Sequence, residues 1–497
     1  MSKLSINLSD YAVGSNQGAE YGMMGQENVD QLNKALSAGD TTGRETTNML
    51  DASGAPLKVE SLDKTLKHLT FRESDIRLWK DVPKKAAYNT VEEYNQQVSY
   101  GQDRGGFNNE GELPEEEDSV YVRRAQLVKY LGVTKSVTHQ MTLVNSAIGP
   151  VMDKTIKDGT MWILRKLNKS LYWGNEKIVP QEFNGYIAQQ MQSDAWASYA
   201  DYMNSEHIVD LRGYALTETA IEDGANSIVE NFGLGTQLYG APAVLSNFVK
   251  NFYGNKFIQP NSEALTNGVM GQRVRTFASQ FGDIGLNQDV FFKKLPSKTS
   301  ASAATSAKAP TKPSWAASNP ITVQAGVAKT KFATADAGNV YYAVTALNRY
   351  GESDLAIYST AAAAVVAGCA IDLKFTDGGG TNAATGYRVY RTKAGATATG
   401  EFFPLFEVSL DDVTRGYDGG GAGVIRDMNR FLPDCDQSVL FQFDEEVIEF
   451  AQLAPLMKMD LAILSPAFRF MVLLYGTPFL YAPKKMVRFI NIGKELK

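Results

Sequence analysis

Few residues in this 497-residue chain have the types and spacing that catalysis or metal binding requires. Only three histidines occur, His68, His139 and His207, and none has a second ligand at a metal-binding spacing. His139 lies in a strand-like run and His207 follows a polar stretch, so we interpret both as ordinary polar residues. No nucleophile motif such as G-x-S-x-G is present. The sequence therefore predicts a protein that is not an enzyme, with no catalytic residue, metal or cofactor.

The densest group of carboxylates is one short run that two arginines follow. Such a run is most often a solvated face, and a metal or acid–base cluster is the sharper alternative. A third interpretation is ion pairing, either with the nearby arginines or with basic residues of another copy of the chain. The candidates for contacts between copies are Glu115, Glu116, Glu117, Asp118, Arg123 and Arg124.

Two other patterns that could bind ligands favour structural roles. The glycine clusters 378–380 and 419–421 lack the Lys-Ser/Thr of a phosphate loop, so they predict turns. Cys369 and Cys435 fit no metal spacing, and we expect two reduced thiols, as suits a cytoplasm.

Composition excludes several classes of protein. Hydrophobic residues make up 44% and charged residues 21%, which is ordinary for a globular chain of two to four domains. The net charge of −6 is unlike that of a dedicated nucleic-acid-binding protein, so contact with DNA should be local or weak. The N-terminus lacks the apolar region of a secretory signal, and we expect no membrane segment.

The N-terminal third contains two segments that cannot be stable alone. Residues 1–56 are rich in Gly, Ser, Asn and Thr and predict an extended arm, with one possible helix over 28–38. Residues 91–142 alternate like strands around a polar, acidic tip and predict a long two-stranded ribbon. Because an isolated ribbon is marginally stable in water, we expect neighbouring copies to support both segments.

Two helices stand out. Apolar residues at helical spacing predict a long helix over 147–172, which Gly174 ends. Its opposite face carries Lys154, Lys157 and Arg165, which either face DNA or form an ordinary solvated surface. A second helix is expected over 217–231, with a capping box between Thr219 and Glu222.

A change of composition marks an insertion. Residues 296–320 are rich in Ser, Ala, Pro and Lys and predict a flexible linker. Runs that alternate at period two follow, at 340–346 and 386–391, and predict a small β sandwich. The mixed character of the first half returns near Asp427, so the sandwich should start and end at nearby points of one host domain.

The order of arm, ribbon, long helix, mixed domain and closing strands resembles the HK97-like major capsid proteins of tailed phages. The run FNNEGELPEEEDSVYVRRAQLVKYLGV resembles the E-loop of that family, and the long helix followed by GNEKIVPQEFNGYI resembles its spine helix. RVRTFASQFGDIGLNQDVFF resembles a strand-turn-strand of the axial domain, and LAPLMKMDLAILSPAFRFMVLLYG resembles the final passage through the fold. The resemblance covers 60–295 and 430–497 well, and the first 60 residues weakly.

The insertion is similar to immunoglobulin-like or fibronectin type III-like modules. YYAVTALNRYGES matches a late strand of such a module and GYRVYRT a middle strand, so their order departs from the usual one.

The resemblance implies an α+β fold with an all-β sandwich insertion. Its expected parts are an N-terminal arm (1–60), an arm-to-core segment (61–92), the E-loop (93–142), a peripheral domain with the spine helix (143–210), the first part of the axial domain (211–295), a linker (296–320), the inserted domain (321–426), and the completion of the axial and peripheral domains (427–497).

The resemblance also implies a function. Copies would form hexamers and pentamers of an icosahedral shell that encloses double-stranded DNA, in the virion, after assembly in the bacterial cytoplasm. Expected partners are other copies, a portal protein, packaged DNA bound non-specifically, and a decoration protein if one exists, with no membrane. The alternatives are a surface adhesin or carbohydrate-binding protein that uses the sandwich, and a hydrolase with an accessory sandwich. A carbohydrate-binding role would predict surface aromatic residues clustered on loops of 321–425.

Overall fold

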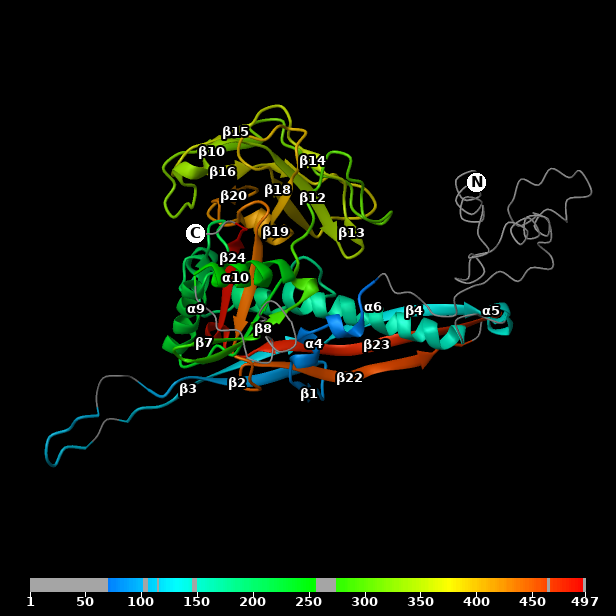
Figure 1. Cartoon of the computed structure of the whole chain (residues 1–497), viewed down its shortest axis with the longest axis horizontal. Coiled ribbons are helices and arrows are strands. Elements are labelled where there is room, and N and C mark those ends of the chain that lie inside the picture. Colours follow the sequence, from blue (N-terminus) through cyan, green and yellow to red (C-terminus); the bar gives the residue numbers. More distant parts are fainter. Residues whose placement is uncertain are drawn as a thin grey trace, which may run out of the picture. The chain divides into compact units, whose positions relative to one another are not determined.

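The computed structural model describes residues 70–101, 106–113, 116–144, 150–255, 274–462 and 465–494, which belong to one compact unit (Figure 1). The expected N-terminal arm, including its helix over 28–38, lies outside these residues, as do His68 and Glu115. In the described part no helix is long and apolar enough to cross a bilayer.

The long helix expected over 147–172 is the spine helix α6 (Val151–Trp173), which begins after Pro150 and packs on a four-stranded sheet. The strands, in order across the sheet, are β1 (Lys84–Ala86), β22 (Ile448–Asp460), β23 (Ala467–Leu480) and β4 (Lys129–Thr138). Ile163 and Leu167 on the buried stripe of α6 enter one hydrophobic core with Phe470 and Val472 of β23. Gly159 permits a close approach, because a Cβ there would lie 3.3 Å from Val472.

The expected ribbon is confirmed, but its second strand divides. β2 (Val91–Ser99) pairs antiparallel with β3 (Val120–Leu127), whereas the next residues form β4 and pair with β23 over ten positions. The expected ribbon over 91–142 is therefore too long at its C-terminal end. His139 does not lie in a strand, since it begins α5 (His139–Leu143).

A six-stranded sheet forms the axial part of the host. Its order is β5 (Ile208–Asp210), β24 (Met486–Ile492), β21 (Asp436–Phe441), β6 (Gln237–Gly240), β8 (Gly282–Gln288) and β7 (Thr276–Ser279). Helices α9 (Glu218–Glu230) and α10 (Pro242–Asn255) accompany it. The capping box expected at Thr219 is wrong: Thr217 caps α9 by accepting the N–H of Ala220, and Glu222 accepts the N–H of Gln280.

Residues 296–427 form a region that consists mainly of β strands (Figure 1). One sheet comprises β10 (Ile321–Gln324), β16 (Ala370–Leu373) and β20 (Ile425–Asp427). A second comprises β13 (Gly351–Glu352), β12 (Tyr342–Asn348), β18 (Gly386–Arg391) and β19 (Phe403–Ser409), with β14 (Ala356–Ile357) also on β12. Two short pairs are β11 (Gly338–Val340) with β15 (Ala363–Val365), and β9 (Ser314–Trp315) with β17 (Phe375–Thr376).

The remaining described elements are short helices at the ends of these layers. They are η3 (Glu73–Asp75), α4 (Leu78–Asp81), α7 (Tyr186–Met191), α8 (Tyr199–Met203), η4 (Val290–Phe292), η5 (Thr334–Asp336), α12 (Leu410–Arg415) and η6 (Pro483–Lys485).

The segment expected to be a flexible linker is instead part of the insertion. Trp315 lies in β9, and its indole N–H donates to the carbonyl of Ala356. Lys298 pairs with Glu352 at 3.0 Å and lies over the ring of Tyr390. Trp315 packs on the face of Val344 and Tyr387, whereas Lys298 lies on the opposite face, beside Tyr390. The segment therefore contributes to the burial of β12 on both faces.

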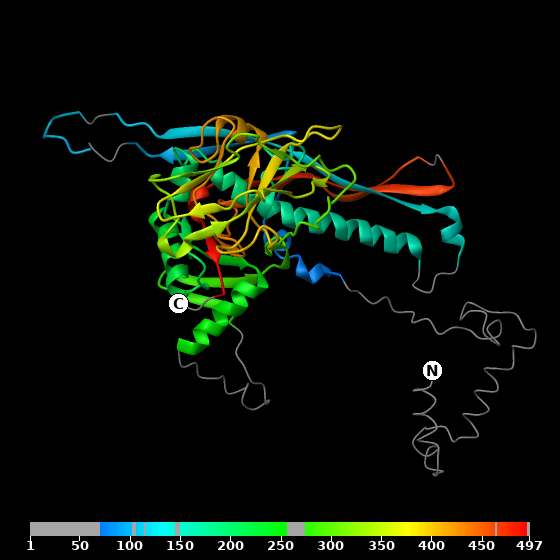
Figure 2. The same ribbon diagram turned by 90° about the horizontal axis from the view of Figure 1, so that it is seen from above.

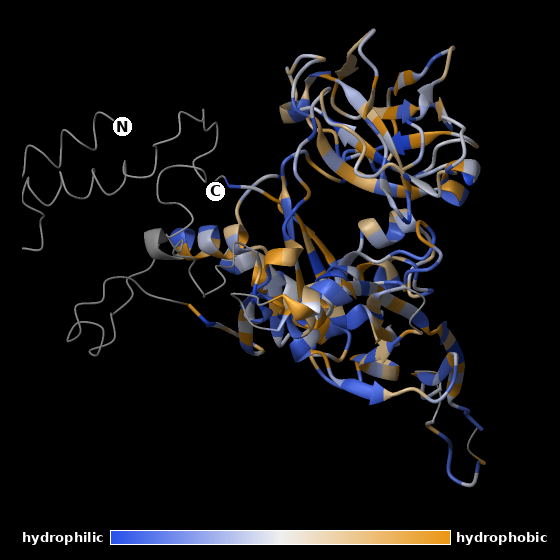
Figure 3. Cartoon of the chain, turned by 90° about the vertical axis from the view of Figure 1, so that its right-hand side faces the viewer, coloured by the Kyte–Doolittle hydropathy of each residue, from blue (hydrophilic) through white to orange (hydrophobic). Residues whose placement is uncertain are grey.

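The insertion and the host share one hydrophobic core. Tyr202, Ile208 and Ile490 of the host cluster with Tyr342 and Ile425 of the insertion. The insertion also starts and ends at nearby points, as expected, since Lys294 forms an ion pair with Asp434. Figure 3 shows hydrophobic segments running through the strands of both regions.

Buried polar contacts lie inside the insertion beside this junction, and one crosses it. Arg391 pairs with Asp427 at 2.7 Å, and the hydroxyl of Tyr342 donates to the same carboxylate. Burial alone would lower the pKa of Arg391, but Asp427 raises it above its ordinary value, so the guanidinium is charged. Arg212 of the host donates to Asp336 of the insertion at 2.9 Å. The insertion is thus joined to the host by a packed interface.

The expected fold class is confirmed. The described chain is α+β, with a ribbon, a long helix on a four-stranded sheet, a six-stranded sheet, and an interrupting region of β strands.

Candidate inter-subunit surface

The ribbon of β2 and β3 is the part of the described chain with the least support from its own fold. It extends away from the other elements in two perpendicular views (Figures 1 and 2). Its strands pair from Val91 with Leu127 to Ser99 with Val120, with a register shift near the outer end. Only two strands carry the tip, so hydrogen bonds to further strands do not stabilise it.

The base of the ribbon is fixed. The ring of Tyr94 meets those of Phe479 and Tyr481 edge to face, at 5.4 and 4.8 Å between centroids. On the neighbouring strand, Arg124 forms an ion pair with Asp194 at 2.7 Å. The ribbon is therefore a projection with a rigid root.

Apolar side chains stand in solvent along the outer ribbon and tip. Phe107, Leu113 and Tyr100 are at least 85% exposed, and Tyr121 and Val98 are more than 60% exposed. Scattered exposed apolar residues are normal, but a concentration on one projection indicates a surface that another molecule covers. The sequence predicts a polar tip. It did not predict that these apolar side chains would be exposed, because alternating apolar residues usually face a core.

The charged candidates separate into two groups. Glu116, Glu117 and Asp118 are exposed near the tip. Within one chain Arg123 lies 3.4 Å from Glu93, and Arg124 forms an ion pair with Asp194. Pairing of the acidic run with basic residues stays a prediction.

The basic residues of the spine helix also differ from one another. Lys154 and Lys157 are exposed on α6. The guanidinium of Arg165 instead lies 5.8 Å from the ring centroid of Phe71, which itself packs on Phe291. A cation–π contact of this kind holds the start of the described chain on the helix.

A second exposed apolar group, which the sequence reasoning missed, lies at the far end of the peripheral sheet. Met141, Leu143 and Val144 of α5 and the residue after it are exposed, and so are Phe468 and Met459 of the adjacent strands. The ring of Phe468 lies 6.0 Å from that of His139. Thr138 to Val144 had been interpreted as strand, which concealed that these side chains share one end of the sheet.

Buried titratable groups in the described chain serve packing. Burial raises the pKa of Asp289, although Asn168, the N–H of Phe291 and Tyr172 all donate to it. The contacts of Asp289 join α6 to η4, and none of its partners is a nucleophile activated by a base. Among the described residues, no three His, Cys, Asp or Glu side chains gather in a metal-binding group.

His207 is the one described histidine that is buried. Its Nε2 lies 3.5 Å from a carboxylate oxygen of Glu206, and its Nδ1 has no hydrogen-bond partner. Burial lowers the pKa of His207. The polar stretch before it gives no sign of this burial, which arises because the ring packs against Trp196 just before β5 begins.

No family model matches the chain. Curated relatives do align over nearly its whole length. The major capsid protein of Staphylococcus phage K is 24% identical over 484 residues, and that of Staphylococcus phage S25-3 is 24% identical over 477. Each alignment covers 94% of this chain and 96% of the relative.

Solved structures of similar arrangement include phage and phage-like shells. The capsid of Cyanophage P-SCSP1u has a TM-score of 0.42 at 8% identity, covering 91% of this chain and 97% of the other. The capsid of an empty GTA particle has a TM-score of 0.43 at 9% identity, covering 89% and 99%.

Proposed function

We propose that this chain is the shell-forming major capsid protein of a phage, and that its copies assemble as hexamers and pentamers of an icosahedral shell. Its alignment with major capsid proteins from end to end supports the first part. The structure of the ribbon is the main support for assembly. Its base is fixed, and its apolar tip has no partner surface within the described chain.

In this proposal each ribbon lies across a neighbouring copy. Covering Phe107, Leu113 and Tyr100 removes apolar surface from water, which favours association. The acidic groups near the tip, Glu115 to Asp118, pair with basic residues of the neighbour. The apolar end formed by α5, Phe468 and Met459 supplies a further contact between copies.

The shell encloses double-stranded DNA, and Lys154 and Lys157 make weak, non-specific contacts with it. Contact of this type is electrostatic and depends on salt concentration. A portal protein and, where one exists, a decoration protein complete the particle. Assembly takes place in the bacterial cytoplasm, and the finished protein resides in the capsid of the virion.

We further propose that the insertion is an immunoglobulin-like or fibronectin type III-like module. Two multi-stranded sheets, mostly antiparallel and enclosing a buried core, support this kinship.

The test is assembly of the purified full-length chain, observed by negative-stain microscopy and sedimentation velocity. The unmodified chain should form shells or hexamers. A Phe107→Ser, Leu113→Ser variant should remain folded but lose these assemblies, since both side chains are exposed in one copy. Thermal unfolding would verify that the variant is folded.

Val366→Ser is the matched control, since Val366 is also exposed, at 52%, but lies in the insertion. It should assemble like the unmodified chain. Normal shells from the ribbon variant, or monomers from the unmodified chain, would contradict the proposal.

A further inference from the structure

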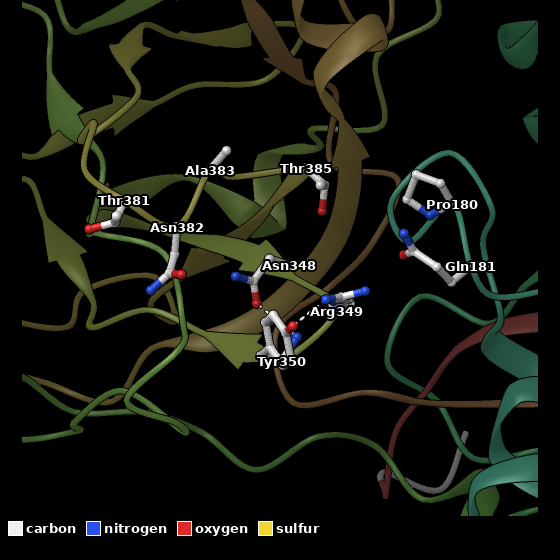
Figure 4. A pocket seen from close by; sticks show the side chains of 9 residues that line it. All are labelled: Pro180, Gln181, Asn348, Arg349, Tyr350, Thr381, Asn382, Ala383 and Thr385. Atoms are coloured by element: carbon white, nitrogen blue, oxygen red, sulfur yellow. Dashed lines mark hydrogen bonds between the residues drawn. The ribbon is translucent and has the colours of Figure 1, made fainter. Parts of the chain in front are cut away.

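The insertion and the host together line an open cavity of about 280 Å³ (Figure 4). The turn Asn348–Tyr350 after β12 forms one wall, and residues 381–385 before β18 form another. Pro180 and Gln181 of the host close a third side. The cavity therefore lies where two paired central strands of the insertion end.

The walls of this cavity are held in place by other parts of the chain. The amide oxygen of Asn348 accepts the N–H groups of Tyr350 and Gly351, and its amide nitrogen donates to the carbonyl of Lys308. Thr385 donates through both its N–H and its hydroxyl to the carbonyl of Leu347. Lys129 donates to the carbonyl of Pro180 at 2.8 Å. Such support fixes the geometry before a ligand arrives.

One cation, Arg349, lines the cavity, and a second, Lys308, lies beside the ring of Tyr350. The guanidinium of Arg349 lies 4.5 Å and the ammonium of Lys308 lies 5.3 Å from the ring centroid of Tyr350. Neither cation has a carboxylate partner among the described residues, whereas most other cations of the insertion do. Two uncompensated cations beside one ring favour an anionic ligand.

The other lining groups indicate a ligand rich in hydroxyl groups. The side chains of Gln181, Thr381 and Asn382 line the cavity and supply both donors and acceptors. In Figure 4 Asn382 and Gln181 lie on opposite sides of the turn that carries Tyr350. The ring of Tyr350 is 44% exposed and offers apolar surface between them.

We propose that this cavity binds an acidic saccharide. The carboxylate of the sugar would pair with Arg349 and Lys308, its hydroxyls would exchange hydrogen bonds with Asn382, Thr381 and Gln181, and its ring would contact Tyr350. This activity goes beyond shell assembly and does not depend on it, because the cavity is complete within one chain.

The experiment measures binding to the full-length chain by isothermal titration calorimetry. The probes are a tetragalacturonate, the uncharged galactotetraose and inorganic phosphate. Tetragalacturonate should bind, with an affinity that falls as salt is added. Arg349→Ala should weaken that binding about tenfold or more, as loss of a charge-assisted contact does.

Arg415→Ala is the matched control, because Arg415 is an exposed arginine of α12 in the same insertion. It should bind like the unmodified chain. Absence of binding, equal binding of galactotetraose, equal binding of phosphate, or equal loss in both variants would each overturn the proposal. Shell formation in the same samples is recorded separately by microscopy, so failure of assembly and failure of binding are distinguished.

Discussion

The ribbon and the insertion both extend from the host fold, and they differ in whether their apolar side chains are exposed or buried. The ribbon leaves the peripheral sheet at Thr90 and returns at Val128 with its tip side chains in solvent. The insertion leaves after Lys294 and returns before Asp434, and it shares a buried core with the host. The ribbon therefore needs another molecule to cover it, whereas the insertion is completed within the chain.

The largest effect should follow from removing the insertion. Replacing 297–426 by a short Gly/Ser linker exposes Tyr202, Ile208 and Ile490, which are buried against it. We expect an insoluble or unfolded chain, measured by soluble yield and circular dichroism. Deleting 102–117 of the ribbon is the control and should leave the fold intact. A soluble, shell-forming chain without the insertion would contradict the inference that the host needs the insertion to complete its core.

A large effect is also expected from breaking the buried ion pair that joins β18 to β20 inside the insertion. Arg391→Met leaves Asp427 buried without its cation, which should cost about 3–5 kcal/mol of unfolding free energy. Denaturant titration measures this loss. Arg391→Met combined with Asp427→Asn should recover much of it, because no charge is then left unpaired. A single variant as stable as the unmodified chain would show that this pair does not stabilise the insertion.

Acid should weaken the host beside the junction while leaving the ribbon unaffected. Burial lowers the pKa of His207 in the folded chain, so the unfolded chain binds this proton more readily. Stability from this group is complete above the ordinary histidine pKa of about 6.5 and is lost as pH falls below it. Melting temperature should fall between pH 7 and 5, and His207→Gln should flatten that slope. The same slope in both chains would exclude His207 as the cause.

The smallest effect on folding should come from the ribbon tip. Glu116→Lys with Glu117→Lys should change unfolding free energy by no more than about 0.5 kcal/mol, since both residues are exposed. Assembly should nevertheless be impaired, as measured by sedimentation. Glu218→Lys on α9 serves as a comparison, because each of these substitutions changes the charge by the same amount. Unchanged assembly and capsid stability would end the hypothesis of acidic pairing across copies.

The sequence was informative wherever local pattern decides structure. The stripe of Ile163 and Leu167 located the spine helix, and Gly174 marked its end. The division of the ribbon into β3 and β4 was not predictable, because β4 pairs with a strand more than 300 residues away. Residues 296–320 have the composition of a flexible linker, but Lys298 and Trp315 bind distant parts of the insertion.

The candidate surface shows the same limit. The acidic residues of the tip could be predicted from composition. The exposure of Phe107 and Leu113 could not, because it depends on no other part of the described chain covering them. The burial of His207 depends on Trp196 and β5, which no local pattern places around it.

Gly159 has a mechanical consequence. Because it has no side chain, the backbone of α6 can lie close to Val472 and Val133 of the sheet. We expect this close packing to make the helix and the sheet move together as one stiff unit, and a larger residue at position 159 to push the two layers apart.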